Sequence, residues 1–285
     1  MKASADAVAV GEAQAGNRAW WTANTMSYDW KDRISREPLS REWFDEVDRR
    51  FIESARHFAH SDRPFGRIIP FDAIAGKRVL EVGCGMGLHT ELMARAGAHV
   101  TAIDISPKSV AATKARLALR GVQADVREAD AEAIDFDEAF EFIWSWGVIH
   151  HSARTGRVLR NLHAALTPGG QLRFMVYSLE GMQSYAVIVS RYLLGFWRGQ
   201  SLDEILWRST DGYLARYFTR DSLADLCRTF FDDVEVEVFG LEADAVPLPA
   251  PLRRLVRPLV SDRYIERAVR KRGAFLFATA TKEGA

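Results

Sequence analysis

The 285-residue chain contains only two cysteines, Cys84 and Cys227. Two cysteines cannot form the disulfide framework of small secreted domains, so the sequence predicts a protein of a reducing compartment. No early segment combines a basic start with an apolar core, which argues against a secretory signal peptide. The most apolar stretch, residues 185–197, contains Arg191 and is too short to cross a bilayer. We therefore expect a soluble, cytoplasmic protein.

An excess of charge of either sign is also absent, because 38 basic residues balance 38 acidic ones. A neutral chain argues against a general basic surface for holding nucleic acid, although it leaves room for a local basic patch. With 48% hydrophobic and 27% charged residues, the composition excludes a disordered or fibrous chain. The sequence also lacks internal repeats and low-complexity tracts.

Short β-branched runs alternate with helical patterns from residue 77 onward, which is typical of βαβ units and a parallel sheet covered on both faces. We expect strands over residues 78–82, 99–103, 122–127, 140–144, 171–176, 234–239 and 274–280. The predicted fold class is α/β, with a doubly wound, mostly parallel seven-stranded sheet, an N-terminal helical cap and a helical lid insertion.

The predicted organisation has five parts. We expect a loose tail over 1–17, an N-terminal helical cap or lid over 18–70, a ligand-binding core over 71–178, a helical lid insertion over 179–218, and the C-terminal part of the sheet domain over 219–285 with a basic insertion at 245–273.

A glycine turn follows the first predicted strand, in the order Glu81-Val-Gly83-Cys84-Gly85-Met-Gly87. Glycines allow positive φ and a close approach of the backbone to a ligand. The spacing is not the G-x-G-x-x-G of dinucleotide sites, and the Gly-Lys-Ser/Thr of a phosphate-binding P-loop is missing. A carboxylate at the strand end disfavours phosphate and favours a ligand with an ammonium or sulfonium group. S-adenosylmethionine (SAM) carries both groups.

Acidic residues also follow the next two predicted strands. Asp104 ends the second strand, where a carboxylate accepts from both hydroxyls of a ribose. Asp130 follows the third strand, where it is placed to accept from an adenine amino group, with Ala131 offering its backbone amide. Three acidic strand ends form a constellation, which is more specific than a single motif.

The chain resembles the class I SAM-dependent methyltransferases over residues 77–178. It has the motifs above in the order of that family, followed by Leu162-His-Ala-Ala-Leu-Thr-Pro168-Gly169-Gly170. The resemblance implies a Rossmann-like methyltransferase fold, SAM as donor and S-adenosylhomocysteine as product. We expect no metal, because the histidines other than His150 and His151 lack clustered partner ligands and Cys84 sits inside the glycine turn. The set of residues that it assigns to the cofactor is Tyr28, Glu81, Gly83, Cys84, Gly85, Gly87, Asp104, Ile105, Asp130, Ala131, Glu132 and Trp146.

The sequence after the fourth predicted strand bears on the methyl acceptor. The segment Ser145-Trp146-Gly147-Val-Ile-His150-His151 is similar to that of the small-molecule branch, and the Asn/Asp-Pro-Pro-Tyr signature of nucleic-acid amino methylation is missing. His150 or His151 is the candidate general base, which is needed only where the nucleophile starts protonated. Either histidine could instead simply pack or hold the loop, and the sequence does not separate them.

Aromatic residues outside the core are candidates for a lid and an acceptor pocket. Tyr28 and Trp30 could close over the cofactor, or they could pack the N-terminal helix against the sheet. Five aromatic residues of the insertion are candidates for the wall of an acceptor pocket, although each could equally pack the insertion against the sheet: Tyr185, Tyr192, Trp197, Trp207 and Tyr213.

The segment 253–272 holds eight basic residues and two acidic ones, a local charge of +6, with leucines and valines between them. It is either a solvated helix face or a contact for an anionic membrane surface or anionic substrate. The predicted function is methyl transfer to an oxygen, nitrogen or carbon nucleophile of a small molecule, in secondary metabolism. The alternatives are methylation of a lipid or lipid-linked sugar at a membrane, a non-catalytic SAM-binding partner protein, and a nicotinamide-dependent oxidoreductase, against which the glycine spacing and Glu81 argue.

Overall fold

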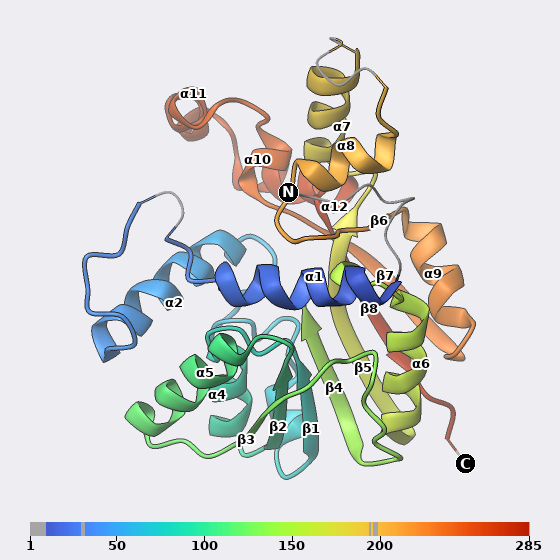
Figure 1. Cartoon of the computed structure of the whole chain (residues 1–285). Coiled ribbons are helices and arrows are strands. Elements are labelled where there is room, and N and C mark those ends of the chain that lie inside the picture. Colours follow the sequence, from blue (N-terminus) through green and yellow to red (C-terminus); the bar gives the residue numbers. More distant parts are fainter. Residues whose placement is uncertain (1–9, 30–31, 194, 196–198, 285) are drawn as a thin grey trace.

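A central β-sheet organises the molecule, which we describe from a computed structural model for residues 10–29, 32–193, 195 and 199–284 (Figure 1). Its strand order is β3-β2-β1-β4-β5-β8-β7, with the two-residue strand β6 pairing with β5. All pairings are parallel except those of β8, which runs antiparallel to both β5 and β7. The strands are β1 (Arg78–Val82), β2 (His99–Asp104), β3 (Asp125–Glu128), β4 (Phe140–Trp146), β5 (Leu166–Ser178), β6 (Tyr217–Phe218), β7 (Asp233–Phe239) and β8 (Phe275–Thr281).

Helices cover both faces of this sheet. The α-helices are α1 (Val10–Ala23), α2 (Arg41–Ala55), α3 (Phe71–Ile74), α4 (Leu88–Arg95), α5 (Pro107–Arg120), α6 (Thr155–Ala165), α7 (Met182–Val187), α8 (Leu202–Arg208), α9 (Arg220–Arg228), α10 (Glu242–Ala245), α11 (Ala250–Val256) and α12 (Asp262–Arg272). Shorter helical turns are the 3₁₀ segments η1 (Ile149–His151) and η3 (Arg257–Leu259) and the π-helical segment η2 (Ile188–Leu193). The doubly wound, mostly parallel α/β class predicted from the sequence is confirmed.

Alternating strand residues supply two separate cores. Val79 packs on one face with residues of α4, α5 and the 55–74 segment, whereas its neighbour Leu80 packs on the other face with residues of α6 and α9. This period of two is the expected signature of a strand with both faces buried. The two cores fix the sheet rigidly, so the carboxyl ends of β1, β2 and β4 form a stable edge.

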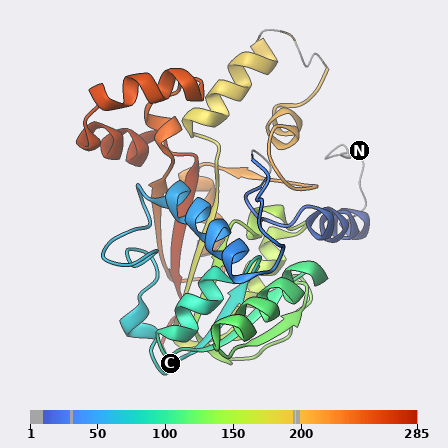
Figure 2. The same ribbon diagram turned by 90° about the vertical axis from the view of Figure 1, so that its left-hand side faces the viewer.

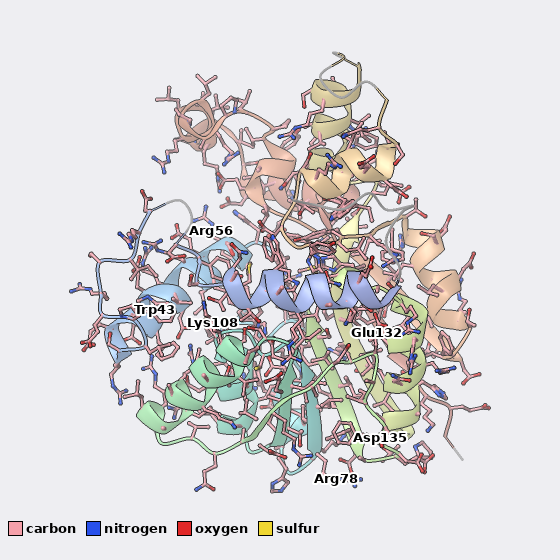
Figure 3. All side chains as sticks on the ribbon, in the orientation of Figure 1. Trp43, Arg56, Arg78, Lys108, Glu132 and Asp135 are labelled. Carbon is pink, nitrogen blue, oxygen red and sulfur yellow. The ribbon has the colours of Figure 1, made fainter. Side chains whose placement is uncertain are left out.

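Helix α1 lies across this edge (Figure 1). The sequence predicted a loose tail through residue 17, but from Val10 the chain is helical. Helix α2 begins at a Ser40 cap, whose hydroxyl accepts from the Trp43 backbone N–H, and its inner side buries Trp43, Phe44 and Val47. Trp43 and Arg56 mark its two ends in Figure 3.

The two insertions gather beyond the same edge, above the sheet (Figures 1 and 2). The first comprises α7, η2 and α8, and the second comprises α10, α11, η3 and α12. In Figure 2 α11 and α12 lie at the upper left, and α12 packs against the end of β7. Among the described residues, no helix is long and apolar enough to span a membrane.

Candidate active site

A cavity of about 710 Å³ lies at the carboxyl ends of β1, β2 and β4, where ligands bind in open α/β sheets. Helices α1 and α2 and the loops after β3 and β4 contribute further walls. Nine of the twelve residues predicted to bind a cofactor line it: Tyr28, Gly83, Cys84, Gly85, Asp104, Ile105, Asp130, Ala131 and Trp146. The structure does not bring Glu81, Gly87 and Glu132 to this wall.

The glycine turn after β1 forms the cavity floor. Gly83, Gly85 and Gly87 all have positive φ, at 84°, 53° and 81°. A Cβ on Gly83 would lie 2.1 Å from Val148 Cγ2, which is far inside van der Waals contact. The turn therefore needs glycine both for its backbone conformation and for the close approach of the β4 loop. The thiol of Cys84 lies in this turn, and burial raises its pKa well above the usual value.

Asp104 holds the turn to the end of β2. Its Oδ2 accepts from the Gly85 backbone N–H at 3.0 Å, and its Oδ1 accepts from the Ser106 backbone N–H at 2.8 Å. Burial raises the pKa of this carboxyl to about 6. A carboxylate has about four acceptor positions, so each Asp104 oxygen can accept one more hydrogen bond from a ligand diol.

Glu81 lies beneath the turn, with only 1% of its surface exposed. It accepts a hydrogen bond from the Thr90 hydroxyl of α4, and its Oε1 lies 4.0 Å from His89 Nδ1. Burial raises its pKa to about 8. Glu81 therefore ties α4 to the strand end. Gly87 also lies behind the cavity wall, where a Cβ would meet Thr113 Cγ2 at 3.0 Å.

The loop after β3 places Asp130 and Glu132 in different surroundings. Asp130 Oδ1 accepts from the Gln14 side-chain amide at 2.8 Å and from the Glu132 backbone N–H at 2.9 Å. The Glu132 carboxylate instead accepts from the Ser152 hydroxyl at 2.6 Å and from the Arg154 backbone N–H at 2.8 Å, beside α6 (Figure 3). Burial alone would raise the pKa of Glu132, but these bonds and the Arg154 guanidinium hold it below its usual value. Glu132 thus anchors the loop after β4.

The structure separates the two adjacent histidines. The His151 ring lines the cavity, and its Nδ1 lies 2.6 Å from the Leu214 carbonyl oxygen. Because a carbonyl can only accept, Nδ1 carries the proton and Nε2 is the basic atom of the neutral ring. His150 is fully buried away from the cavity wall, and its ring centroid lies 4.0 Å from that of Tyr177. Among the described residues its ring nitrogens have no hydrogen-bond partner, and burial lowers its pKa well below the usual value.

Tyr28 forms part of the cavity wall together with α2. Its ring stacks on Phe51 with centroids 5.1 Å apart, and its carbonyl oxygen accepts from Arg50 Nη1 at 2.9 Å. The residue has a φ of 57°, which is uncommon outside glycine. Burial raises the pKa of its hydroxyl above the usual value. Trp30, the second predicted lid residue, lies outside the described residues.

The sequence predicted a helical cap or lid over 18–70, but it did not identify the individual residues that α1 and α2 contribute to the site. Asn17 of α1 donates from Nδ2 to the His151 carbonyl oxygen at 2.6 Å, across 134 residues of sequence. Phe51 and Phe58 line the cavity, and Phe58 stacks on Trp146 with centroids 5.7 Å apart. The only sequence signal for these walls was the aromatic content of the N-terminal region, because the contacts depend on the tertiary arrangement.

The insertion aromatics are not part of the cavity wall as far as the structure describes them. Trp207 is buried at 2% exposure and Tyr185 is 47% exposed, and neither lines the cavity. Tyr213 packs against α1, where a Cβ on Gly16 would lie 2.4 Å from its ring. The side chain of Tyr192 and all of Trp197 lie outside the described residues. Asp211 of the insertion and Tyr177, near the end of β5, line the cavity instead.

These residues fit SAM as a bound cofactor. The glycine cradle leaves no room for a Cβ at Gly83, Asp104 retains acceptor positions for a ribose, and Asp130 lies further along the same wall. For the part of the chain that the structure describes, no group of three or more histidine, cysteine or carboxylate side chains is arranged to hold a metal ion.

Comparisons with known proteins agree with this geometry. A family model described as a methyltransferase domain matches residues 79–170. Two similar curated proteins are named ubiquinone biosynthesis O-methyltransferase. The one from Paramagnetospirillum magneticum is 34% identical over 191 residues, covering 66% of this chain and 73% of that protein. The one from Aromatoleum aromaticum is 28% identical over 207 residues, covering 68% and 82%.

Among solved structures, an S-adenosylmethionine-dependent methyltransferase from Mesorhizobium loti superposes with a TM-score of 0.50 at 20% identity, covering 73% of this chain and 92% of that one. At this identity the match shows the fold alone, whereas the curated relatives share both sequence and most of their length with this chain. The chain therefore belongs to the class I SAM-dependent methyltransferases.

Proposed function

We propose that this enzyme methylates a hydroxyl oxygen of a small molecule that has an apolar or aromatic body. The observation that carries the proposal is the position of His151 in the cavity wall, with Nδ1 committed to the Leu214 carbonyl oxygen. A histidine held in one tautomer, with Nε2 as its basic atom, is the group required when the nucleophile starts as a protonated hydroxyl. The curated relatives carry the name O-methyltransferase, which supports the same acceptor atom.

Each part of the cavity then has a chemical task. SAM, when bound, supplies a methyl group on a positively charged sulfur. The turn from Gly83 to Met86 and Asp104 would hold the cofactor by close backbone approach and by accepting from its ribose, and Asp130 and Ala131 would lie on its adenine side. Phe51, Phe58 and Trp146 exclude water, which favours an in-line transfer in a dry site. His151 Nε2 takes the hydroxyl proton, and the Leu214 carbonyl stabilises the resulting imidazolium through Nδ1–H.

The wall opposite the glycine turn supports an apolar acceptor with at least one polar group. Phe58, Met175 and Phe275 give it an apolar surface. Tyr177 and Asp211 place polar atoms in the same wall, and Arg254 adds a cation. Pockets of this kind orient a ligand by a few polar groups within an otherwise apolar lining. We propose a phenol or a similar hydroxylated ring as the acceptor class.

The test is turnover of a panel of phenols, aliphatic alcohols and amines with SAM, followed by mass spectrometry of both products. We expect S-adenosylhomocysteine and an O-methylated product from at least one phenol. For that acceptor, His151→Ala should lower kcat by about 100-fold or more, in the range usual for general bases, and leave the Kd for SAM within twofold.

His150→Phe is the matched control, because it keeps a planar ring in the buried position and removes two nitrogens that have no hydrogen-bond partner among the described residues. It should leave kcat within about threefold and keep or raise the melting temperature. Full activity of His151→Ala would remove the base assignment. Methylation of amines with no phenol turnover would overturn the oxygen assignment.

A further inference from the structure

Exposed apolar side chains are concentrated on the two insertions. Ten large hydrophobic residues are exposed among the described residues, and eight of them belong to the 179–218 and 240–273 regions. The other two are Leu39 and Leu119, which lie elsewhere. The eight are Tyr185, Val189, Leu202, Leu248, Leu252, Leu255, Leu259 and Tyr264. Single exposed leucines are ordinary, but a contiguous group marks an interaction surface.

Helix α11 and the 3₁₀ segment η3 that continues it carry the two most exposed members of this group, Leu255 and Leu259. Leu252, Leu255 and Leu259 are spaced by three and four residues along this helical stretch, which places them on one side of it, and Leu248 lies two residues before α11 begins. Leu255 is 74% exposed and Leu259 is 86% exposed, and α11 has no buried residue. We call these four side chains the leucine row. In Figure 1 α11 stands apart from the sheet.

Cations without partners lie next in the chain, on α12. Arg263, Arg267, Arg270, Lys271 and Arg272 are exposed, and within the described ranges no carboxylate lies within ion-pair distance of them. By contrast, Arg257 between the two helices pairs with Glu242 and Asp262. If the row were buried against another protein, these five positive charges would have no counter-charges unless that partner were strongly acidic.

The same region borders the cavity. Arg254 of α11 and Leu241, which precedes α10, both line it together with Phe275 of β8. A surface that receives the leucine row would therefore lie beside one side of the cavity. A second cleft of about 600 Å³ lies beside the C-terminal end of α12, and four cationic side chains and one carboxylate line it: Arg220, Arg270, Lys271, Arg272 and Glu180.

We propose that the leucine row and the α12 cations dock this enzyme onto the surface of a bilayer containing anionic phospholipids. Leucines insert into the acyl boundary, and the arginines and lysine remain at the level of the phosphates, as in amphipathic interfacial helices. The row is apolar and the charge beside it is positive, which matches a lipid surface better than nucleic acid, since nucleic acid offers no apolar phase. Docking would place the cavity beside the lipid, whichever acceptor atom is methylated.

The experiment is sedimentation of the full-length protein with phosphatidylcholine vesicles, with and without phosphatidylglycerol. The wild type should pellet with the anionic vesicles, more weakly with neutral ones, and less at high salt. Leu255→Ser/Leu259→Ser should lower the partition coefficient at least tenfold. The matched control, Leu39→Ser/Leu119→Ser, should leave it within twofold. Circular dichroism and SAM binding verify that each variant is folded.

A fluorescent label reports insertion directly, because Cys84 and Cys227 are both buried. An environment-sensitive dye on Leu259→Cys should shift to the blue with anionic vesicles, and the same dye on Leu119→Cys should not. No vesicle binding by the wild type overturns the proposal. Vesicle binding that survives the loss of both leucines also overturns it, because the protein would then adsorb by charge alone. A concentration-dependent dimer that depends on Leu255 and does not bind vesicles overturns it as well.

Discussion

The two halves of the cavity are built in different ways. The half that we propose for the cofactor consists of a glycine turn and carboxylates at the ends of consecutive strands, from Gly83 to Asp130. The half that we propose for the acceptor brings together Phe51, His151, Asp211 and other side chains from segments spread over much of the chain. One half is therefore encoded in a continuous stretch, and the other exists only after the insertions and the N-terminal helices have packed onto the sheet.

This difference predicts which half tolerates change. The cofactor half relies on backbone N–H groups and on Asp104, which the two cores hold in place. The acceptor half relies on side chains positioned by loops, such as the Leu214 carbonyl that orients His151. Loops on a rigid scaffold vary more readily than the scaffold itself. Substitutions in the acceptor half should therefore change turnover while cofactor affinity stays constant.

After His151→Ala itself, the largest effect that isolates the acceptor half is expected from Gly212→Ala. A Cβ at this position would lie 2.5 Å from His151 Nδ1, and Gly212 has a φ of 93°. The ring must move away from the Leu214 carbonyl, so kcat should fall by about 30-fold or more, part of the range that a general base supplies. The Kd for SAM should change by less than twofold, measured by calorimetry.

Gly199→Ala provides the matched control, because Gly199 has a φ of 88° and no atom of the described residues lies within 4 Å of the added Cβ. Both variants carry a left-handed alanine, which costs about 1–2 kcal/mol, so their melting temperatures should fall similarly. Equal kcat values for the two would show that Gly212 has no part in positioning His151. A displaced base should also change the pH profile of kcat, which a loss of stability alone would not do.

The converse effect is expected from Asp104→Ala, which should weaken SAM binding more than tenfold. The variant loses a charge-assisted contact to two ribose hydroxyls and leaves the Gly85 and Ser106 N–H groups without their acceptor. Asp104→Asn keeps one acceptor oxygen and should give an intermediate Kd. Calorimetric titration of both variants decides this, and an unchanged affinity in Asp104→Ala would exclude the ribose role.

Cofactor affinity should also depend on pH through the same residue. Burial raises the Asp104 pKa from 3.8 to about 6, so the carboxylate that accepts from ribose is lost as pH falls through 6. SAM affinity should decrease by up to about tenfold per pH unit below that value. The stability of the unliganded protein should depend on pH in the opposite direction to SAM affinity, because the Asp104 pKa is higher in the folded state than in the unfolded state. The stabilisation from this carboxyl is complete below pH 3.8 and is lost as pH rises through 6. A titration at pH 5–7 in which Asp104→Asn shows the same slope as the wild type would contradict this.

The predictability of the fold follows the same division. The strands, the glycine turn and Asp104 were predictable because period-two patterns and strand-end residues are local features. Helix α1 was not, since residues 10–17 carry no strong apolar period, and tertiary contacts such as that of Asn17 with the His151 carbonyl hold the helix. The sequence could not decide between His150 and His151 as the candidate base, because that choice depends on which ring faces the cavity. Two adjacent histidines give no local signal for this.

The smallest effect is expected where the two halves meet, at Gln14 of α1. Its Nε2 donates to Asp130 Oδ1 at 2.8 Å, and its Oε1 accepts from the Ala153 backbone N–H at 3.3 Å, so one side chain connects the loops after β3 and β4. Gln14→Ala should therefore raise the Kd for SAM and lower kcat together, each by about three- to tenfold, since each lost hydrogen bond is worth about 1 kcal/mol.

Arg18→Ala on the same helix removes a solvent-exposed pair with Glu128 and should change neither value by more than about twofold. If Gln14→Ala changed one parameter alone, the two halves would be independent. A joint change, absent in Arg18→Ala, would instead show that α1 couples cofactor binding to the geometry of the acceptor site. Helix α1, which the sequence pattern does not predict, would then join the two halves into one site.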